Sequence, residues 1–475
     1  MSPEMAKSAI FSLGFLLAKT QELKSPIDLN EALKFPLSPI PLAIAHADGE
    51  RRKTNKSSLY DHALSSSQSS ECPHVDGSKA YVLDLAAQLR SIIKVPDTFE
   101  ALAMQLLNGI PNAYKKNYIA CDTYRDLSIK FPERKLRGAS QKLLLRSAKV
   151  RIRPDFQNFL CNGDNKERLF QLIEDTWIKN KEMISDRFVY FARGDLCMAI
   201  TSEGAEEIPQ LKTNHEEADT KIAYLVDHAI TNGASEVCIR STSGDIDIPV
   251  ILVGAFGLNT EYIFVDNGTG KNRKRVRIDS STLSLKQQKA LVGFHAFTGN
   301  DYVSNFMRKS KRVWKTVEKD NTMLDFLGQL GEGQLTDETH KEAKKFVCTM
   351  YGDKRVQNVN ELRGKLFWSR LRKNGKVPDL SLLPPCASTL RRHSARAHYV
   401  AKIWKQACSP LQHIDSFSNN GWLPDGSVDW IERAYPSDVE SLFIAAVPEN
   451  DVNDDDGDDD DNVDDDFSDE EDNAI

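Results

Sequence analysis

The stretch NHEEADTKIAYLVDHAITNGASEVCIRSTSGDIDIPVILVGAF, residues 214–256, decides the fold class of this chain. Its first half predicts a helix, because four apolar side chains recur at helical spacing. They are Ala218, Ile222, Leu225 and Ala229. Asn214 is the expected N-cap, Glu217 completes a capping box three residues on, and Gly233 is a suitable helix stop.

The second half of the stretch adds a strand and another helix. The run EVCIR (236–240) predicts a strand and the segment STSGDID (241–247) a loop. PVILVGAF (249–256) predicts a helix with Pro249 in its first turn. Helix, strand and helix in this order are typical of an α/β sheet.

Similar patterns lie on both sides of this stretch. Upstream, strands are expected in AYVLDLAAQL (80–89), in NYIACDTY (117–124) and twice in RFVYFARGDLCMAI (187–200), around a Gly-Asp turn. Downstream, EYIFVD (261–266) and KRVRID (274–279) form a strand pair. Beyond Ser284 the chain is mostly helical to about Gln412. The expected fold class is therefore α/β, a mostly parallel sheet flanked by helices, with a helical C-terminal region.

These patterns divide the 475 residues into four parts. Residues 1–77 are expected to be a partly helical N-terminal extension, and residues 78–320 an α/β core with a basic insertion at 124–180. Residues 321–447 form the helical C-terminal region, which ends in an aromatic-rich segment. Residues 448–475 are expected to be a disordered acidic tail.

The composition favours an intracellular protein. No uninterrupted apolar run of roughly 18 residues occurs, so no membrane span is expected. The short apolar run near the N-terminus is a poor secretory signal. The eight cysteines show neither a disulfide framework nor a zinc-ligand spacing, and several are expected to be small buried hydrophobes.

The charge is unevenly distributed along the chain. The formal net charge is −7, but the last 25 residues contain 15 acidic side chains and no basic ones. The rest of the chain has 62 basic residues against 54 acidic ones. A basic body suggests a surface for a polyanion such as nucleic acid, with the tail as a competitor. The tail alone is more simply explained as a solubilising segment.

Acidic residues recur where the expected strands end and helices begin. The set comprises Asp84 and Asp122 at strand ends, Glu217 and Asp219 at a helix start, Asp245 and Asp247 after a strand, and Asp301 in the turn TGNDY. In open α/β sheets, sites form beyond the carboxyl ends of the strands, so these side chains can meet in one crevice. Taken singly, each is more often an ordinary turn or cap residue.

A cluster of carboxylates suits phosphodiester hydrolysis. That reaction needs an activated water and neutralisation of the developing charge, which two divalent ions roughly 3.5–4 Å apart supply. Mg²⁺ and Mn²⁺ take hard oxygen ligands such as carboxylates. Because so many carboxylates without a counter-ion would repel one another, bound metal is the simplest way to hold them together.

The order of these motifs resembles the flap-endonuclease and XPG-type branch of the PIN-like nucleases. The matching elements are VLDLAAQL with Asp84, ACDTYRD with Asp122, the helix start at Glu217 and Asp219, the loop with Asp245 and Asp247, and Gly299-Asn300-Asp301-Tyr302. The resemblance covers about residues 78–320. It implies a PIN-like, Rossmann-like core whose seven acids hold two Mg²⁺ or Mn²⁺ ions. HAFTGND (295–301) and residues 383–406 also look similar to large uncharacterised invertebrate proteins with this core.

The chain departs from that family in three respects. Some eighty residues precede Asp84, whereas the family begins almost at its first strand. VSNFMRKSKRVWKTV (303–317) is basic but lacks the glycines of the family's helix–hairpin–helix. Glu217 and Asp219 are two residues apart, so they share a metal only at an irregular first helical turn, and Glu216 with Asp219 is the geometric alternative.

Basic segments supply the candidate phosphate contacts. Residues 112–153 contain twelve Lys or Arg and three acids. In the related nucleases this position begins a basic arch. The resemblance therefore implies phosphate contact and charge neutralisation for Arg125, Lys130 and Arg134 as catalytic residues and for Arg137 as a nucleic-acid contact. An exposed basic helix explains the segment equally well.

Two further basic runs follow the strands. RKSKR supplies Arg308, Lys309, Lys311 and Arg312 as candidate nucleic-acid contacts. KNRKRVR (271–277) is slightly better explained as solvated surface, and either run could be a nuclear import signal.

Two other features carry no site. GTGK (268–271) lacks the Walker spacing and is expected to be a hairpin turn. Five histidines share no metal-ligand spacing, so structural or surface roles are expected for His215, His228, His295, His393 and His398.

Three functions follow from these patterns. The first is a divalent-metal-dependent nuclease acting on DNA or RNA, with a nuclear location expected from the basic runs. The second is a catalytically silent PIN-like module that binds nucleic acid or a protein partner. The third is an interaction protein whose acidic tail binds basic partners such as histones. The complete set of acids favours the first.

Overall fold

The structure of the chain is a computed structural model, and it describes residues 29–36, 40–65, 78–125, 128–129, 141–257, 262–278, 282–375 and 378–430. Three candidate phosphate contacts, Lys130, Arg134 and Arg137, lie outside the described residues, as does the acidic tail expected at 448–475. The first 28 residues of the expected N-terminal extension lie outside them as well.

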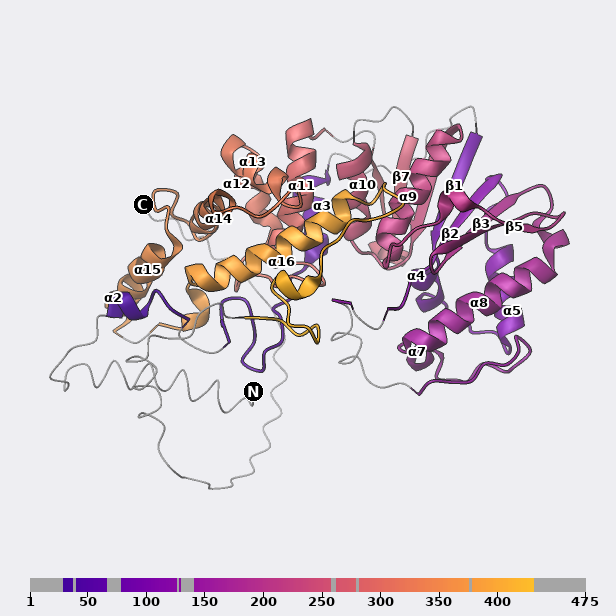
Figure 1. The fold of residues 1–475 in the computed structure, drawn as a ribbon, viewed down its shortest axis with the longest axis horizontal. Helices are drawn as coiled ribbons and strands as arrows, with labels where there is room; N and C mark the ends of the chain where they lie inside the picture. Colours follow the sequence, from indigo (N-terminus) through magenta and orange to yellow (C-terminus); the bar gives the residue numbers. More distant parts are fainter. Residues whose placement is uncertain are drawn as a thin grey trace, which may run out of the picture.

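An eight-stranded sheet forms the centre of the α/β part (Figure 1). In their order across the sheet, the strands are β5 (Ala205–Glu207), β4 (Leu196–Ile200), β3 (Phe188–Arg193), β2 (Lys116–Ala120), β1 (Ser78–Asp84), β6 (Ala234–Ser241), β7 (Tyr262–Asn267) and β8 (Lys274–Arg277). Strands β3, β2, β1, β6 and β7 run parallel, whereas β4, β5 and β8 pair antiparallel at the two edges. The mostly parallel α/β sheet expected from the sequence is confirmed. The Gly-Asp turn between β3 and β4 and the GTGK turn between β7 and β8 are also where the sequence places them.

Alternate side chains of the central strands face two separate helical layers, as the period of two in a strand requires. In β1, Ala80 and Val82 belong to one core, and Tyr81 and Leu83 to another. The helices of the first layer are α9 (Ala218–Thr231) and α10 (Asp247–Phe256); those of the second are α4 (Leu85–Arg90), α5 (Phe99–Asn108), α7 (Phe156–Phe159) and α8 (Gly163–Lys179). Figure 1 shows these layers on opposite sides of the strands.

The region after the sheet is helical, as expected between Ser284 and Gln412. Its α-helices are α11 (Leu285–Phe297), α12 (Trp314–Val317), α13 (Asn321–Gln329), α14 (Asp337–Met350), α15 (Val359–Asn374) and α16 (Ala387–Lys405). The long helix α16 contacts α10, α11 and α14 (Figure 1). Because the buried residues of α10 and α11 belong to one core, these helices extend the first layer.

Short 3-10 helices link the larger elements. They are η1 (Lys56–Ser58), η3 (Lys181–Ile184), η4 (Pro209–Leu211), η5 (Gly270–Asn272), η6 (Lys311–Val313), η7 (Leu380–Leu382) and η8 (Phe417–Asn419).

Part of the expected N-terminal extension is built into the fold. Residues 40–65, called the N-terminal segment below, contain η1 and α3 (Leu59–Ala63), and α2 (Leu29–Ala32) precedes them. Tyr60 is buried in the core of the first layer. The segment is joined to the loop after α11 by two backbone hydrogen bonds of 2.7 Å, from Asn305 N to Arg52 O and from Met307 N to Ala43 O.

The start of α9 corrects one expectation. Asn214 does not cap this helix, which begins at Ala218, and the N-cap residue Glu217 makes no side-chain capping bond. Instead, the amide of Asn214 donates to Gln412 O at 2.9 Å and its oxygen accepts from Gln412 N at 2.7 Å. Tertiary pairing thus overrides the local capping pattern. The end of α9 is as expected, since Gly233 adopts a φ of +83° just beyond it.

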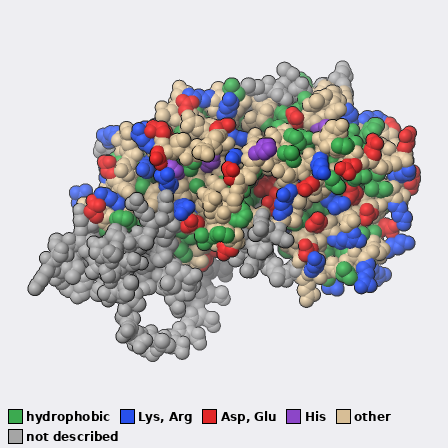
Figure 2. All heavy atoms as spheres, in the orientation of Figure 1, with side chains coloured by type: hydrophobic (Ala, Val, Ile, Leu, Met, Phe, Trp, Pro, Cys, Tyr) green, Lys and Arg blue, Asp and Glu red, His purple; other side chains and the backbone are tan. Residues whose placement is uncertain are grey.

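Three further expectations can be compared with the described residues. Pro249 lies in the first turn of α10, as expected. The seven described cysteines are all free, and five of them are buried. Among the described residues no helix is both long enough and apolar enough to cross a bilayer. Figure 2 shows basic and acidic side chains interspersed over the described part of the visible face.

Candidate metal centre

The strand order creates a crevice at the carboxyl edge of the sheet. The chain passes from β1 to β2 and β3 on one side, and later enters β6 and β7 on the other side of β1. In open α/β sheets ligands bind where the strand order reverses in this way. The reversal lies between β1 and β6, so the residues just after these two strands are the first candidates for a site.

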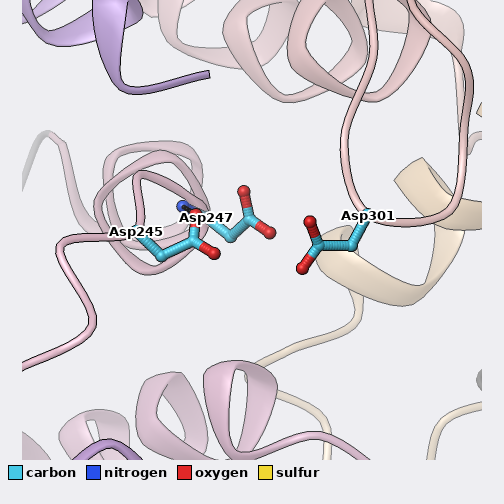
Figure 3. A group of neighbouring side chains, drawn as sticks. All are labelled: Asp245, Asp247 and Asp301. Atoms are coloured by element: carbon cyan, nitrogen blue, oxygen red, sulfur yellow. Dashed lines mark hydrogen bonds between the residues drawn. The ribbon is translucent and has the colours of Figure 1, made fainter. Parts of the chain in front are cut away.

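Three carboxylates meet at this edge. Asp245 and Asp247 follow β6, and Asp301 lies in the loop after α11. One oxygen atom from each lies within 4.8 Å of the other two, the only such group of three among the described residues. Figure 3 shows the three side chains pointing toward one another, Asp245 and Asp247 from one side and Asp301 from the other. We call these three residues the acidic cluster.

A lysine of the N-terminal segment is the counter-ion of the acidic cluster. Lys56 Nζ lies 2.6 Å from Asp245 Oδ2, 3.1 Å from Asp247 Oδ2 and 2.8 Å from Asp301 Oδ1. Burial opposes the charged ammonium, but the carboxylates of Asp247, Asp245 and Asp301 outweigh it and raise the pKa of Lys56. The lysine is therefore charged at neutral pH.

The loop that carries Asp245 is fixed by side chains from two other elements. Asn267, at the end of β7, accepts from Gly244 N at 3.1 Å and donates to the carbonyl oxygen of Asp245. Tyr60 of the N-terminal segment donates to the same carbonyl at 3.2 Å. Gly244 has a φ of +77°, a conformation that favours glycine and turns the chain toward α10. The position of Asp245 thus depends on β7 and on the N-terminal segment.

Asp247 is the most buried member of the acidic cluster, with a side chain only 4% exposed. Its Oδ1 lies 2.6 Å from His295 Nε2. Burial lowers the pKa of His295 well below its usual value, so the imidazole is neutral and donates from Nε2 to the carboxylate. The ring also stacks on Trp404, with centroids 5.3 Å apart. The hydrogen bond from His295 therefore fixes the orientation of the Asp247 carboxylate.

The loop that carries Asp301 is held in place by a buried lysine side chain. Lys311 Nζ donates to His295 O, Thr298 Oγ1 and Gly299 O at 3.3, 2.9 and 2.6 Å. Gly299 has a φ of +109°, and a Cβ there would lie 3.0–3.1 Å from Asn305. This loop is consequently tight, and it presents Asp301 to the cluster with its side chain 45% exposed.

Asp84 lies at the end of β1, where the sequence places it, and is buried. Its Oδ1 accepts from Ala87 N at 3.0 Å and so caps α4. Its Oδ2 accepts from the Ser241 hydroxyl at the end of β6, at 3.1 Å. Asp84 therefore joins the two strands that flank the switch in strand order.

Asp122 follows β2 and has a capping role of its own. Its Oδ1 accepts from Ala218 N, the first residue of α9, at 3.0 Å, and Tyr124 donates to its Oδ2 at 3.3 Å. A carboxylate from a distant strand thus takes the capping position that local sequence assigned to Asn214. It is not among the three residues of the acidic cluster.

Glu217 and Asp219 begin α9, with Glu217 at the N-cap in an extended conformation. Because Glu217 lies before the first helical residue, regular helical spacing does not fix its side chain relative to Asp219. Burial raises the pKa of Asp219 well above its usual value, followed by the charges of Glu217, Asp247, Asp245 and Asp84. The hydroxyl of Tyr302 hydrogen-bonds Glu217. The charges of Glu217, Asp219 and Asp84 therefore lie close to those of the acidic cluster.

The carboxylates of the acidic cluster repel one another. Burial raises the pKa of Asp245 to about 7, and the nearby charge of Asp247 adds to this while Lys56 opposes it. The N-termini of α4, α9 and α10 also lie at this edge, since Asp84, Glu217 and Asp247 begin those helices. Their partial positive charge favours anions. A cation with more charge than one ammonium would still relieve repulsion.

The candidate phosphate contacts are only partly surface residues. Arg125 pairs with Asp195 of the β3–β4 turn, with Nη2 and Oδ1 2.9 Å apart. Arg308 and Arg312 are exposed, and Lys309 lies with its ammonium 4.4 Å from the centre of the Tyr351 ring. The prediction is wrong for Lys311, which is fully buried and donates to three interior oxygens. The sequence RKSKR gave no sign of this, because a buried lysine cannot be told from its exposed neighbours within a run of basic residues.

Sequence reasoning missed Lys56, Tyr60, Asn267 and Ser241 as neighbours of the site. The N-terminal segment shows no periodic pattern and no motif, so nothing local singled out Lys56. Asn267 directly follows the strand EYIFVD and Ser241 the strand EVCIR, and a polar side chain at a strand end was the available signal for both. His295 was expected to be structural, and it contacts a carboxylate of the acidic cluster.

Comparison with known proteins adds no relative to this picture. No protein-family model matches the chain, and no curated protein matches it. The case for a function therefore rests on the geometry of the acidic cluster and its neighbours.

Proposed function

We propose that this chain is a divalent-metal-dependent nuclease that hydrolyses nucleic-acid phosphodiesters. The observation that carries the proposal is the convergence of Asp245, Asp247 and Asp301 beyond β6, at the switch in strand order. Three further acids border them. A site in this position whose candidate ligand atoms are all carboxylate oxygens is suited to binding a hard cation rather than to nucleophilic or thiol chemistry.

The donor set fits Mg²⁺ or Mn²⁺. All ligand atoms offered by the acidic cluster are carboxylate oxygens, which these ions prefer over nitrogen and sulfur. Asp301 is 45% exposed, so the site is open to water and substrate on its side. Asp84, Glu217 and Asp219 are the residues that would hold a second ion, as the proposed two-ion arrangement requires. Bound divalent metal would supply an activated water and neutralise charge on the phosphate.

The protein's own residues would prepare this chemistry. The imidazole of His295 holds Asp247 in one orientation, and Asn267 with Tyr60 hold the backbone of Asp245. Preorganised ligands lose little freedom on binding, which favours tight and specific coordination. Arg308 and Arg312, which are exposed shortly after Asp301 in the chain, would contact the phosphate backbone of the substrate.

The PIN-like family and a nuclear location belong to the same proposal. The support for a PIN-like fold is the parallel sheet β3-β2-β1-β6-β7 together with the order of the acidic motifs along the chain. Fold-level likeness alone would not define an activity, so the test must address the site itself.

The experiment is cleavage of labelled single-stranded, duplex and flapped DNA and RNA in the presence of Mg²⁺ or Mn²⁺. The wild type is compared with Asp245→Asn/Asp247→Asn, which keeps the side-chain size but removes two ligand charges. We expect metal-dependent cleavage by the wild type and a loss of at least about 100-fold in the double variant.

A matched control removes two carboxylates elsewhere. Asp325→Asn/Glu332→Gln changes the charge equally, and both side chains are exposed, at 58% and 66%. This control should cleave like the wild type. Equal cleavage by all three proteins would show that the activity does not come from the acidic cluster, and no cleavage by any of them would reject the nuclease.

A second candidate is a silent module of the same fold that binds nucleic acid or a protein partner. The observation that favours it is Lys56, whose ammonium already neutralises part of the acidic cluster. A buried ion-pair network needs no metal to persist. Retained nucleic-acid binding without cleavage, unchanged in Asp245→Asn/Asp247→Asn, would support this candidate.

A further inference from the structure

We propose that Lys56 and a divalent cation compete for Asp245, Asp247 and Asp301, so that the N-terminal segment is a built-in regulator of metal loading. This inference rests on the proposed function, because it assumes that the acidic cluster binds metal. It goes beyond that function by assigning a role to residues 40–65 that no motif in the chain indicates.

The first support is the geometry around the ammonium. Lys56 Nζ contacts all three members of the acidic cluster at 2.6–3.1 Å, and its side chain is only 20% exposed. It contacts Oδ2 of Asp245 and of Asp247 and Oδ1 of Asp301, so a cation placed at the position of Nζ would meet the same three oxygens. The resident cation of this site is thus a side chain.

The second support is the attachment of the N-terminal segment to both walls of the site. On one wall, Tyr60 donates to the carbonyl oxygen of Asp245 at 3.2 Å. On the other wall, Asn305 N donates to Arg52 O at 2.7 Å, four residues after Asp301. The segment is hydrogen-bonded to the loops that carry Asp245 and Asp301. A movement of Lys56 is therefore coupled to the distance between these two carboxylates.

Competition follows from the size and charge of the two cations. Mg²⁺ binds carboxylate oxygens at about 2.0–2.1 Å, so an ammonium left on the same oxygens would lie within roughly 5 Å of the metal. Two cations at that distance repel one another strongly in a partly buried site. The metal must therefore displace Lys56 from the cluster. By thermodynamic linkage, any contact that stabilises Lys56 in the acidic cluster by a given factor weakens metal binding by the same factor.

The test measures Mn²⁺ binding to the full-length chain by calorimetry or by the paramagnetic resonance of the free ion. Lys56→Met removes the competing charge and keeps an unbranched apolar side chain. We expect its affinity for Mn²⁺ to exceed that of the wild type by roughly 5- to 150-fold, the usual range for coupled sites. Lys56→Arg, which keeps the charge, should stay near the wild type.

Lys53→Met is the matched control. Lys53 belongs to the same segment, is exposed, and lies three residues before Lys56, so the substitution and the charge change are identical. Its affinity for Mn²⁺ should equal that of the wild type. An equal gain in both variants would show a general charge effect and would overturn the competition.

The remaining outcomes separate this inference from the proposed function. Metal binding that requires Asp245 and Asp247 but is unchanged or weaker in Lys56→Met overturns the inference and leaves the metal site standing. No binding by the wild type or by Lys56→Met overturns both. Binding seen only in Lys56→Met supports both, because Lys56 then excludes the metal from the wild-type site.

A folding defect in the variant also gives an answer. Lys56→Met leaves three carboxylates without their counter-ion, so the metal-free variant should melt at a lower temperature. Mn²⁺ should raise its melting temperature more than that of the wild type or of Lys53→Met, because the ion replaces the missing charge. The variant Lys56→Gln, which retains a hydrogen-bond donor, repeats the comparison. A melting temperature of both variants that Mn²⁺ does not change would overturn the inference.

Discussion

His295 and Asp247 form a buried hydrogen bond of 2.6 Å, in which a neutral imidazole donates from Nε2 to a carboxylate oxygen of the acidic cluster. Neither side chain is more than 4% exposed. A histidine in this arrangement does not bind a metal itself. It fixes the position and the basicity of a ligand, a role that is common around metal centres in proteins.

Replacing this histidine should weaken metal binding without removing a ligand. We expect His295→Ala to lower the affinity for Mn²⁺ by about 10- to 100-fold, because Asp247 loses the neutral donor that fixes its carboxylate. The control is His393→Ala, which also removes a fully buried imidazole but one that contacts Phe297 O at 2.8 Å. The control should lose stability and keep its metal affinity. Equal affinities in the two variants would contradict a supporting role for His295.

Asp122 is expected to act on the stability of α9. Its Oδ1 accepts from Ala218 N, so Asp122→Ala should lower the free energy of unfolding by about 1 kcal/mol, the usual cost of a lost helix cap. Asp122→Asn keeps an acceptor oxygen and should stay close to the wild type in urea unfolding. A nuclease activity lost in the stable Asn variant would identify Asp122 as a metal ligand in addition. A stable Ala variant would contradict the capping role.

Arg308 and Arg312 are the described members of the basic run that remain available for phosphate. If they contact nucleic acid, Arg308→Ala/Arg312→Ala should make the dependence of log affinity on log salt shallower by about 2 units. The control Lys341→Ala/Lys354→Ala removes two exposed charges, one in α14 and one in the loop after it, and should leave the slope unchanged. The same slope in both double variants would place the nucleic-acid surface elsewhere.

Buried histidines predict loss of stability in acid. Burial lowers the pKa of His215 to about 4, against about 6.5 in an unfolded chain. Between these values the unfolded chain binds the proton and the folded one does not, so stability is lost as the pH falls from about 6.5 to about 4. The contribution of this fully buried side chain is on the order of 3 kcal/mol.

The comparison of wild type with His215→Gln isolates this contribution. The variant has no group that titrates at this position, so its unfolding free energy should fall less steeply between pH 6.5 and pH 4. Asp245 and Asp219, whose pKa values are raised, act in the opposite direction but equally in both proteins. Parallel pH profiles would contradict the assignment of a neutral buried imidazole to His215.

Local pattern was sufficient for every strand of the sheet except β5. Apolar runs of strand length predicted β1, β2, β3, β6 and β7, because buried strands of a parallel sheet need apolar side chains on both faces. The edge strands β4 and β8 were predicted as the second members of strand pairs joined by turns. Gly233 and Pro249 marked a helix end and a helix start, since their backbone preferences are intrinsic to the residue. The α/β class and the helical C-terminal region followed from the order of these elements.

Part of the candidate site could also be predicted from the sequence. Asp245, Asp247 and Asp301 come together as expected, because the carboxyl ends of parallel strands share one edge of a sheet. The remaining acids were placed at the correct strand and helix ends. Their partners were not, since capping of α9 by Asp122 joins residues 96 positions apart and competes with the local candidate Asn214.

The sequence by itself determined the elements of this protein and the edge at which its acids gather, because backbone preference and hydrophobic period act between near neighbours. Only the tertiary structure decided which charges share a site and which are hidden. Lys56 reaches Asp245 across 189 positions of the chain, and Lys311 is buried within a run of surface-type residues. Both outcomes depend on long-range packing and on the cost of leaving a buried charge unpaired, and no local pattern encodes these.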